Sequence, residues 1–522
     1  MMRNIIQRIL LISSLLGLFT IFSSAYAQTP PNVLVVGQIA EPKSLDPQAV
    51  TAINDFRILM NVYEGLVRYK NGSLEVEPAL AESWTISEDG KKYTFKLREG
   101  VKFHDGSPLN ADAVVFNFER MLDEDHPFHN TGPFPLSFFF SAVEDVKAVD
   151  AKTVEFTLNA PFAPFLSNLA YPTGLIVSPE AVKKYKTEFG RNPSGTGPFK
   201  FAEWEANNKV VVVNNENYWG DKAKVEAVVF RPITDANTRV AEMLSGNLDI
   251  MVEVPPVSLD KFSSDSFELK EQAGPHVWFL ILNAKEGPFA DKRVRQAANY
   301  AINKQAIVED VLEGTAQVAA GPTPPAFAWA YNEDLEPYPY NPEKAKALLK
   351  EAGIKDATLT FYVTEGGSGM LDPIPMATAI QADLKAVGID VNIETYEWNT
   401  FLGKVNPGLE GKADMAEMAW MTNDPDTLPF LALRTEAWPE KGGFNSGYYS
   451  NPKVDALLNA ARESTDQAER AKLYKQMQEI VQEDAPWVFV ANWKQNAVVN
   501  SDVQNFELEP SFFLLLDDVS KQ

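Results

Sequence analysis

The sequence predicts an α/β protein of two or three domains, and three observations lead to this prediction. The chain has 522 residues, and globular domains usually hold about 100 to 200 residues. Hydrophobic residues make up 45% of the chain, which is enough to build folded cores. Segments with the period of amphipathic helices alternate with short runs typical of buried strands, and this alternation is the pattern of α/β folds.

The N-terminus predicts a cleaved secretory signal peptide over residues 1–27. Arg3 and Arg8 supply positive charge, and a mostly apolar stretch follows over residues 9–22. Small residues come next and end in Ala25-Tyr26-Ala27, the A-x-A pattern of a cleavage site. A membrane anchor is the alternative, but this stretch is shorter than the roughly 20 residues that span a bilayer. We therefore expect an exported protein that is soluble after cleavage near Ala27.

The predicted strands are short apolar or alternating runs, and turn residues bound them. The first, NVLVVGQIA, ends at a loop that contains Pro42 and Pro47. The predicted strands cover residues 32–40, 83–86, 93–97, 153–158, 210–214, 227–232, 248–252, 278–283, 358–363, 390–395 and 487–490.

The predicted helices carry apolar residues on one face and start or stop at capping residues. In the first, Phe56, Leu59 and Val62 share a face. Asn110 or the residue beside it is expected to cap a helix, and Gly353 to end another. The predicted helices cover residues 55–67, 111–118, 235–245, 292–302, 342–350, 376–387, 451–462 and 467–482, with a short one starting at Pro179.

The composition excludes several classes of protein. Because the chain has no cysteine, it has no disulfides, thiolate metal sites, iron–sulfur clusters or cysteine nucleophiles. A net charge of −24 argues against binding nucleic acid or an anionic membrane surface. His126 and His129 are three residues apart, but they lie in a proline-containing loop without a third ligand. We predict no metal site and no cofactor.

No catalytic motif stands out. A GxSxG elbow, a Walker A loop, an HExxH helix and a GxGxxG turn before a helix are all missing from the sequence. The glycine cluster of residues 366–369 lacks the lysine and the following helix of a phosphate loop. We therefore predict a protein that is not an enzyme.

Aromatic residues near strand ends are more informative about binding. Trp398 follows the predicted strand over residues 390–395, and Trp420 is also interpreted as standing at a strand end; polar or acidic loops come after both. In α/β lobes, ligands bind at the carboxyl ends of strands, and an aromatic surface beside amide and acid groups suits a polar organic solute. The alternative for each tryptophan is a place in the core.

A series of motifs resembles the extracytoplasmic solute-binding proteins of family 5, the dipeptide, oligopeptide and nickel receptors of ABC transporters. The motifs run in order over nearly the whole mature chain. They include SLDP (44–47), YEGL (63–66), KYTFKLREGVKFHDG (92–106), NADAV (110–114), GTGPF (195–199), NYW (217–219), RVRQA (293–297), NPEKA (341–345) and YSNP (449–452).

The resemblance implies a two-lobed periplasmic-binding-protein fold of type II, with an inserted subdomain and the ligand between the lobes. Lobe I would comprise residues 28–73, 194–275 and 491–522, with the subdomain at 74–193, and lobe II residues 276–490. It also implies a monomer in the periplasm of a Gram-negative bacterium, where hinge closure around a small-molecule ligand precedes docking on ABC-transporter permease subunits in the inner membrane. No chemistry on the ligand and no cofactor are implied.

One departure from the family pattern bears on the ligand. Peptide-binding members resemble one another at a Trp-x-small-Asp stretch whose Asp pairs with the α-ammonium group of the peptide. Aligned on Asp424-Pro425-Asp426, this chain has Met421 at that position. A thioether does not compensate a buried ammonium charge, which costs several kcal/mol when unpaired. The alternative is that Asp424 substitutes through a shifted loop.

These considerations give the candidate ligand-binding residues: Trp278, Trp398, Asn399, Trp420, Met421, Asn423, Asp424, Asp426 and Arg434. Asp426 is alternatively a helix cap, and Arg434 a member of a surface ion pair. The expected ligand is a peptide, or a peptide-like, opine or sugar-conjugate solute without an ordinary free α-amine. The alternative function is a secreted hydrolase with a carboxylate pair. A sensory or chaperone-like role is a third possibility, because it would have the same sequence features as a role in transport.

Overall fold

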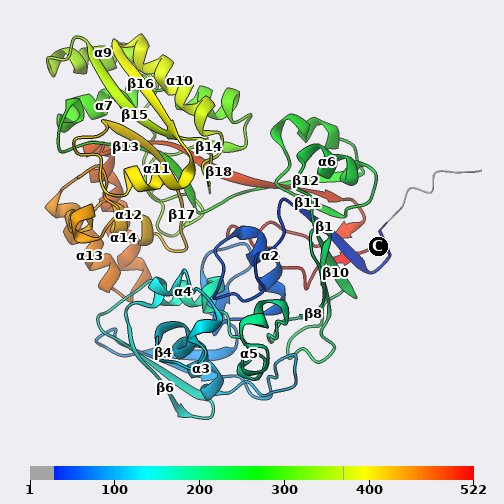
Figure 1. The fold of residues 1–522 in the computed structure, drawn as a ribbon. Coiled ribbons are helices and arrows are strands. Elements are labelled where there is room, and N and C mark those ends of the chain that lie inside the picture. The colour runs from blue at the N-terminus through cyan, green and yellow to red at the C-terminus, as the bar shows by residue number, and fades with distance from the viewer. Residues whose placement is uncertain (1–28, 368) are drawn as a thin grey trace, which may run out of the picture.

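The computed structural model describes residues 29–367 and 369–522, which fold into two lobes joined by crossing strands (Figure 1). The predicted signal peptide lies outside the described residues. Within the described part of the chain, no helix has the length and apolarity that crossing a membrane requires.

One twelve-stranded sheet runs through both lobes. Its main path is β16-β15-β17-β13-β18-β11-β1-β10-β9-β8, and β12 and β14 each pair with β18. The strands are β1 (Val33–Gln38), β8 (Phe199–Glu205), β9 (Lys209–Asn214), β10 (Ala227–Pro232), β11 (Ile250–Val252), β12 (Phe267–Ala273), β13 (His276–Leu282), β14 (Ala316–Val318), β15 (Ala357–Thr364), β16 (Ile389–Tyr396), β17 (Met415–Met421) and β18 (Trp487–Asn500).

The sheet is mixed, with parallel pairs in both lobes. In lobe I, β1 lies parallel to β10 and β11, and in lobe II, β15 lies parallel to β16 and β17. Helices pack around these strands: α2 (Ile53–Val62) and α6 (Ala236–Leu244) in lobe I, and in lobe II α7 (Lys292–Ala301), α8 (Lys304–Ala306), α9 (Pro342–Glu351), α10 (Pro373–Ala386), α11 (Trp398–Val405), α12 (Thr427–Ala432), α13 (Pro452–Glu463) and α14 (Gln467–Asp484).

A separate four-stranded antiparallel sheet, β4-β5-β7-β6, forms the inserted subdomain. Its core is aromatic: Phe118 packs edge-to-face on Phe156, with ring centroids 4.8 Å apart. The elements are β4 (Ala81–Ile86), β5 (Lys92–Leu97), β6 (Val143–Asp150), β7 (Thr153–Leu158), α3 (Ala111–Leu122), α4 (Phe165–Ala170) and α5 (Pro179–Tyr185); short pairs β2 (Val67–Tyr69) with β3 (Val76–Pro78) and β19 (Val503–Gln504) with β20 (Ser520–Lys521) complete the fold. The exact domain boundaries given above stay a prediction.

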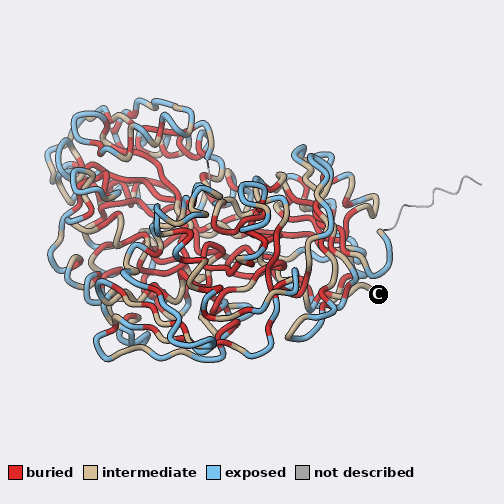
Figure 2. The backbone as a smooth tube through the Cα atoms, turned by 60° about the horizontal axis from the view of Figure 1, so that its bottom comes forward, coloured by how far each residue is buried: buried red, intermediate tan, exposed pale blue. Residues whose placement is uncertain are grey.

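β18 is the longest strand and passes from one lobe to the other. Its first half pairs with β13 of lobe II, and its second half pairs with β12 and β11 of lobe I. The prediction of a strand over 487–490 was too short, because the polar residues from Lys494 to Asn496 interrupt the apolar pattern. Gln495 and Asn496 pair with β12 and are buried all the same, and the buried backbone continues through the middle of the molecule (Figure 2).

Two other expectations needed correction. Helix α2 ends at Val62 rather than at residue 67, because Tyr63 turns into extended backbone and Gly65 forms a β-bridge with Leu175. The neighbouring Glu64 is held by hydrogen bonds from distant residues, which no local pattern reveals. Strand β12 was missed because its sequence, FELKEQA, is mostly polar.

Candidate functional site

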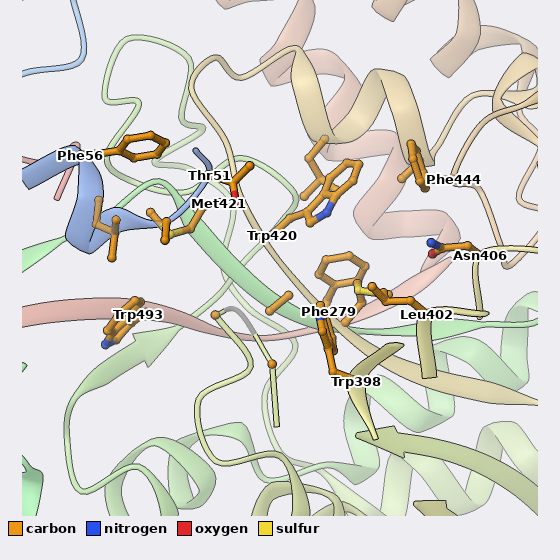
Figure 3. A pocket seen from close by; sticks show the side chains of 18 of the residues that line it. Thr51, Phe56, Phe279, Trp398, Leu402, Asn406, Trp420, Met421, Phe444 and Trp493 are labelled. Carbon is orange, nitrogen blue, oxygen red and sulfur yellow. The ribbon is translucent and has the colours of Figure 1, made fainter. Parts of the chain in front are cut away.

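A cavity of about 680 Å³ lies between the lobes, a size typical of sites for small organic ligands. Lobe I contributes the start of α2 and Trp493 of β18, and lobe II contributes β13, β17, α11 and α12 (Figure 3). The lining residues are Ile39, Thr51, Ala52, Ile53, Asn54, Phe56, Tyr171, Glu253, Phe279, Ile281, Gly367, Gly369, Trp398, Leu402, Asn406, Met418, Ala419, Trp420, Met421, Leu428, Ala432, Phe444, Ser446 and Trp493.

Aromatic rings form much of the cavity wall, and neighbouring aromatic residues hold several of them in place. Trp398 stacks on Phe401, with ring planes 14° apart and centroids separated by 5.9 Å. Trp420 meets Phe444 edge-on at 5.6 Å. Because these rings pack against aromatic neighbours, they offer preorganised flat surfaces to a ligand at little entropic cost.

Glu253 is the single charged residue among the described lining residues. Its Oε1 lies 2.7 Å from Nη1 of Arg57, whose side chain is completely buried. Glu253 has a φ of +55°, a strained conformation for a residue with a side chain. Its backbone carbonyl accepts a hydrogen bond from Arg239 at 3.2 Å. The carboxylate is therefore compensated by a buried guanidinium and is not a free countercharge.

The acidic loop after β17 lies outside the cavity. Asp424 accepts hydrogen bonds at Oδ1 from Arg470 Nη2 (2.6 Å) and at Oδ2 from Ser167 Oγ (2.9 Å). Burial disfavours the charged form of Arg470, but Asp424, Tyr474 and Asp426 together outweigh this effect and raise the pKa of the guanidinium. Asp426 pairs with Arg462 through Nε at 3.0 Å, while burial raises the pKa of this carboxyl group. Both acids are thus neutralised by arginines of lobe II.

The same loop joins lobe II to the inserted subdomain. Besides the Ser167 hydrogen bond, Asn423 Nδ2 donates to Asn168 Oδ1 at 2.6 Å. Ala163 of the subdomain donates its backbone N–H to the carbonyl of Arg462 at 2.8 Å. Ser167 and Asn168 lie on α4, so this helix and the loop over residues 423–426 hold one end of the cleft together. We call these contacts the α4 latch.

The predicted site residues divide into three groups in the structure. Trp398, Trp420 and Met421 line the cavity. The second group is buried in the loop after β17. Asn423 and Asp424 belong to the α4 latch, and Asp424 also pairs with Arg470. Asp426 pairs with Arg462, and its side chain does not cap α12.

Three further predicted residues lie away from the cavity. Trp278 is completely buried in the core of lobe II, because alternate residues of β13 face opposite sides and Phe279 faces the cavity. Asn399 is exposed and donates to Glu397 Oε1. Arg434 stacks over the ring of Phe430, at 3.4 Å from its centroid, and donates to Asn459.

Sequence reasoning missed several lining residues, chiefly Phe56, Glu253, Phe279, Phe444 and Trp493. The two-residue period of strand β13 is a signal for Phe279, once one face of that strand is assigned to the core. The others come from segments far apart in the chain, and no local pattern joins them.

Among the described residues, no group of three or more His, Asp or Glu side chains is arranged to hold a metal ion.

Comparisons with known proteins give a consistent result. The model of the bacterial extracellular solute-binding proteins, family 5, matches residues 75–439. Heme-binding protein A of Haemophilus influenzae is 38% identical over 86% of this chain and 85% of its own length. The dipeptide-binding protein of Escherichia coli is 34% identical over 95% of this chain and 96% of its own. The structure of HbpA2 from Haemophilus parasuis superposes with a TM-score of 0.86 at 34% identity, covering 94% of this chain and all of that one.

Proposed function

The chain belongs to family 5 of the bacterial extracellular solute-binding proteins, and from this premise we propose which kind of ligand it carries. It is the substrate-binding component of an ABC importer, which captures a small ligand and delivers it to a membrane permease. Its relatives are transport proteins rather than enzymes, so the hydrolase alternative receives no support from them. The periplasmic relatives and the predicted signal peptide support a periplasmic location; a monomeric state stays a prediction.

The proposed ligand is an organic solute with an apolar or aromatic body and no free α-ammonium group. The observation that carries this proposal is the lack of a free carboxylate among the described lining residues. Met421 lines the cavity at the position where peptide-binding members carry the aspartate, and Asp424 is already paired with Arg470. An ammonium group in this cavity would lose its hydration without gaining a countercharge, which costs several kcal/mol.

Peptides with a blocked N-terminus, opines and sugar conjugates fall into the proposed class. So does a porphyrin, and one relative is named for binding heme. The aromatic side chains on both sides of the cavity support flat ligands in particular, because rings stack favourably on supported tryptophans.

The test compares matched ligands on the mature chain, residues 28–522. A dipeptide, the same dipeptide with an acetylated N-terminus, an opine and hemin are assayed by thermal shift and calorimetry. A ligand at about 100 times its Kd should stabilise the protein by about 2.7 kcal/mol. We expect stabilisation by at least one ligand without a free α-amine, and none by the free dipeptide. Preferential binding of the free dipeptide would overturn the proposal.

A single substitution supplies the control. Met421→Asp places a carboxylate at the position that the family pattern assigns to the ammonium partner, and Met421 is partly exposed, so the acid can be hydrated in the unliganded protein. We expect this variant to gain affinity for the free dipeptide.

A separate test distinguishes binding for transport from hydrolysis. Each bound ligand is recovered after incubation, and an unchanged ligand excludes its hydrolysis.

A further inference from the structure

His276 lies where the two lobes join. Strand β12 of lobe I ends at Ala273, and β13 of lobe II begins at His276, two residues after Gly274. Both strands pair with β18, so the crossing point on that side is the pair Asn492 and Trp493. The Asn492 side chain donates to the carbonyl of His276 at 2.8 Å, which adds a second connection at the crossing.

The imidazole of His276 is completely buried, and each ring nitrogen has one backbone partner. Nδ1 accepts from the backbone N–H of Trp493 at 3.2 Å, and Nε2 donates to the carbonyl of Gly369 at 2.7 Å. An imidazole that accepts at Nδ1 and donates at Nε2 is neutral and carries its proton on Nε2. Burial also lowers the pKa of His276 to about 4, which keeps the ring neutral near pH 7.

Both partners of His276 line the ligand cavity. Trp493 belongs to the crossing strand β18, whereas Gly369 follows β15 in lobe II. Close to Gly369, Gly367 lies against the indole of Trp398: a Cβ atom on Gly367 would stand 2.4 Å from Cε3 of that ring. Gly367 therefore supports Trp398, and His276 ties Gly369, two residues further along the chain, to Trp493.

We propose that His276 is a positioning residue. It fixes the position of the cavity wall at Trp398 relative to Trp493 of the crossing strand β18. It does not touch the ligand. Its two hydrogen bonds join a wall of lobe II to the strand that crosses between the lobes, so that a change at the crossing is transmitted to the aromatic surface. The inference concerns the unliganded protein and does not depend on which ligand binds.

Two variants separate this role from simple packing. His276→Leu fills the space but removes both hydrogen bonds, whereas His276→Gln keeps one donor and one acceptor. In His276→Leu we expect the amide of Trp493 to exchange about tenfold or more faster, because its N–H loses its partner. We also expect the 19F resonance of 5-fluorotryptophan at Trp398 to shift or broaden. His276→Gln should restore both signals at least in part. The resonance of Trp84, on β4 of the subdomain, is the control and should stay unchanged in both variants.

If His276→Leu keeps its fold and leaves the Trp398 resonance unchanged, the proposal is wrong. The wild-type protein gives a second test that needs no variant, in case the leucine variant does not fold. Long-range 1H–15N spectra resolve the tautomers of the four histidines of the chain. We expect His276 as the neutral Nε2–H form at pH 7; a proton on Nδ1 would overturn the proposal, because Trp493 would then have no acceptor.

Discussion

Asp424 and Arg470 form an ion pair in which both side chains are buried, with Oδ1 and Nη2 2.6 Å apart. The side chains are 1% and 8% exposed. Asp424 also accepts the hydroxyl of Ser167 across the cleft. Asp424, which a shifted loop would offer as the ammonium partner in place of Met421, is therefore already committed to Arg470 and to the α4 latch.

We predict that breaking this pair from one side strongly destabilises the protein. Asp424→Asn leaves Arg470 as an uncompensated buried cation, and breaking a buried pair costs about 3–5 kcal/mol. The free energy of unfolding in urea measures this loss. Glu82→Gln breaks an exposed pair with Lys96 and should cost less than about 1 kcal/mol. Equal losses in both variants would contradict the buried-pair account.

Two tryptophans should respond to substitution in opposite ways. Trp420→Ala removes a cavity wall and should weaken ligand binding about tenfold or more, with little change in thermal stability. Trp278→Ala empties a core position and should cost about 3–5 kcal/mol of stability. Calorimetry with whichever ligand of the proposed panel binds the wild type, together with thermal denaturation, distinguishes these outcomes. Loss of binding in a Trp278 variant that keeps full stability would place Trp278 at the site instead.

Glu417 should make the stability of lobe II depend on pH. Burial raises its pKa to about 8, although a hydrogen bond from the Thr364 backbone N–H acts in the opposite direction. The unfolded carboxyl group titrates near 4.5, so the folded state binds more protons between these values. The contribution of Glu417 to the free energy of unfolding is thus fully present below pH 4.5 and declines as the pH rises towards 8. Glu417→Gln keeps the acceptor and removes the titration.

We expect the melting temperature of Glu417→Gln to exceed that of the wild type at pH 8 and to approach it near pH 5. Glu333→Gln, at an exposed glutamate, serves as the control and should leave the profile unchanged. Parallel profiles for wild type and Glu417→Gln from pH 5 to 9 would refute the assignment.

The α4 latch should control how far the cleft opens. Ser167→Ala removes a hydrogen bond to a charged group between α4 and the loop after β17, worth about 1.5–3 kcal/mol. Since the chain has no cysteine, spin labels at Glu124→Cys and Lys350→Cys report the distance between subdomain and lobe II without interference. We expect Ser167→Ala to shift this distribution to longer distances. Ser141→Ala, at an exposed serine of the same subdomain, should not; an unchanged distribution in both would show that the latch does not restrain the cleft.

Much of the fold was predictable because its elements carry strong local signals. The strand over residues 153–158 and the helix after Asn110 follow from period and capping, and Asn110 does accept from the N–H of Ala113. Of the site, Trp398, Trp420 and Met421 were predicted at places that line the cavity. Phe56, Glu253 and Trp493 were not, since they come from three segments that meet only in the folded protein.

The sequence by itself determined the family, the α/β class and the absence of cysteine chemistry. Motifs and hydrophobic period are carried by residues close together in the chain, and composition does not depend on the fold. Only the tertiary structure decided which side chains face the cavity. In the sequence, Asp424 reads as an acid available to a ligand. In the folded protein it is paired with Arg470. Trp278 and Phe279 are neighbours in the chain, yet one lies in a core and the other at the cavity. The physical reason is that charge compensation and the choice of the buried face depend on residues brought from elsewhere in the chain.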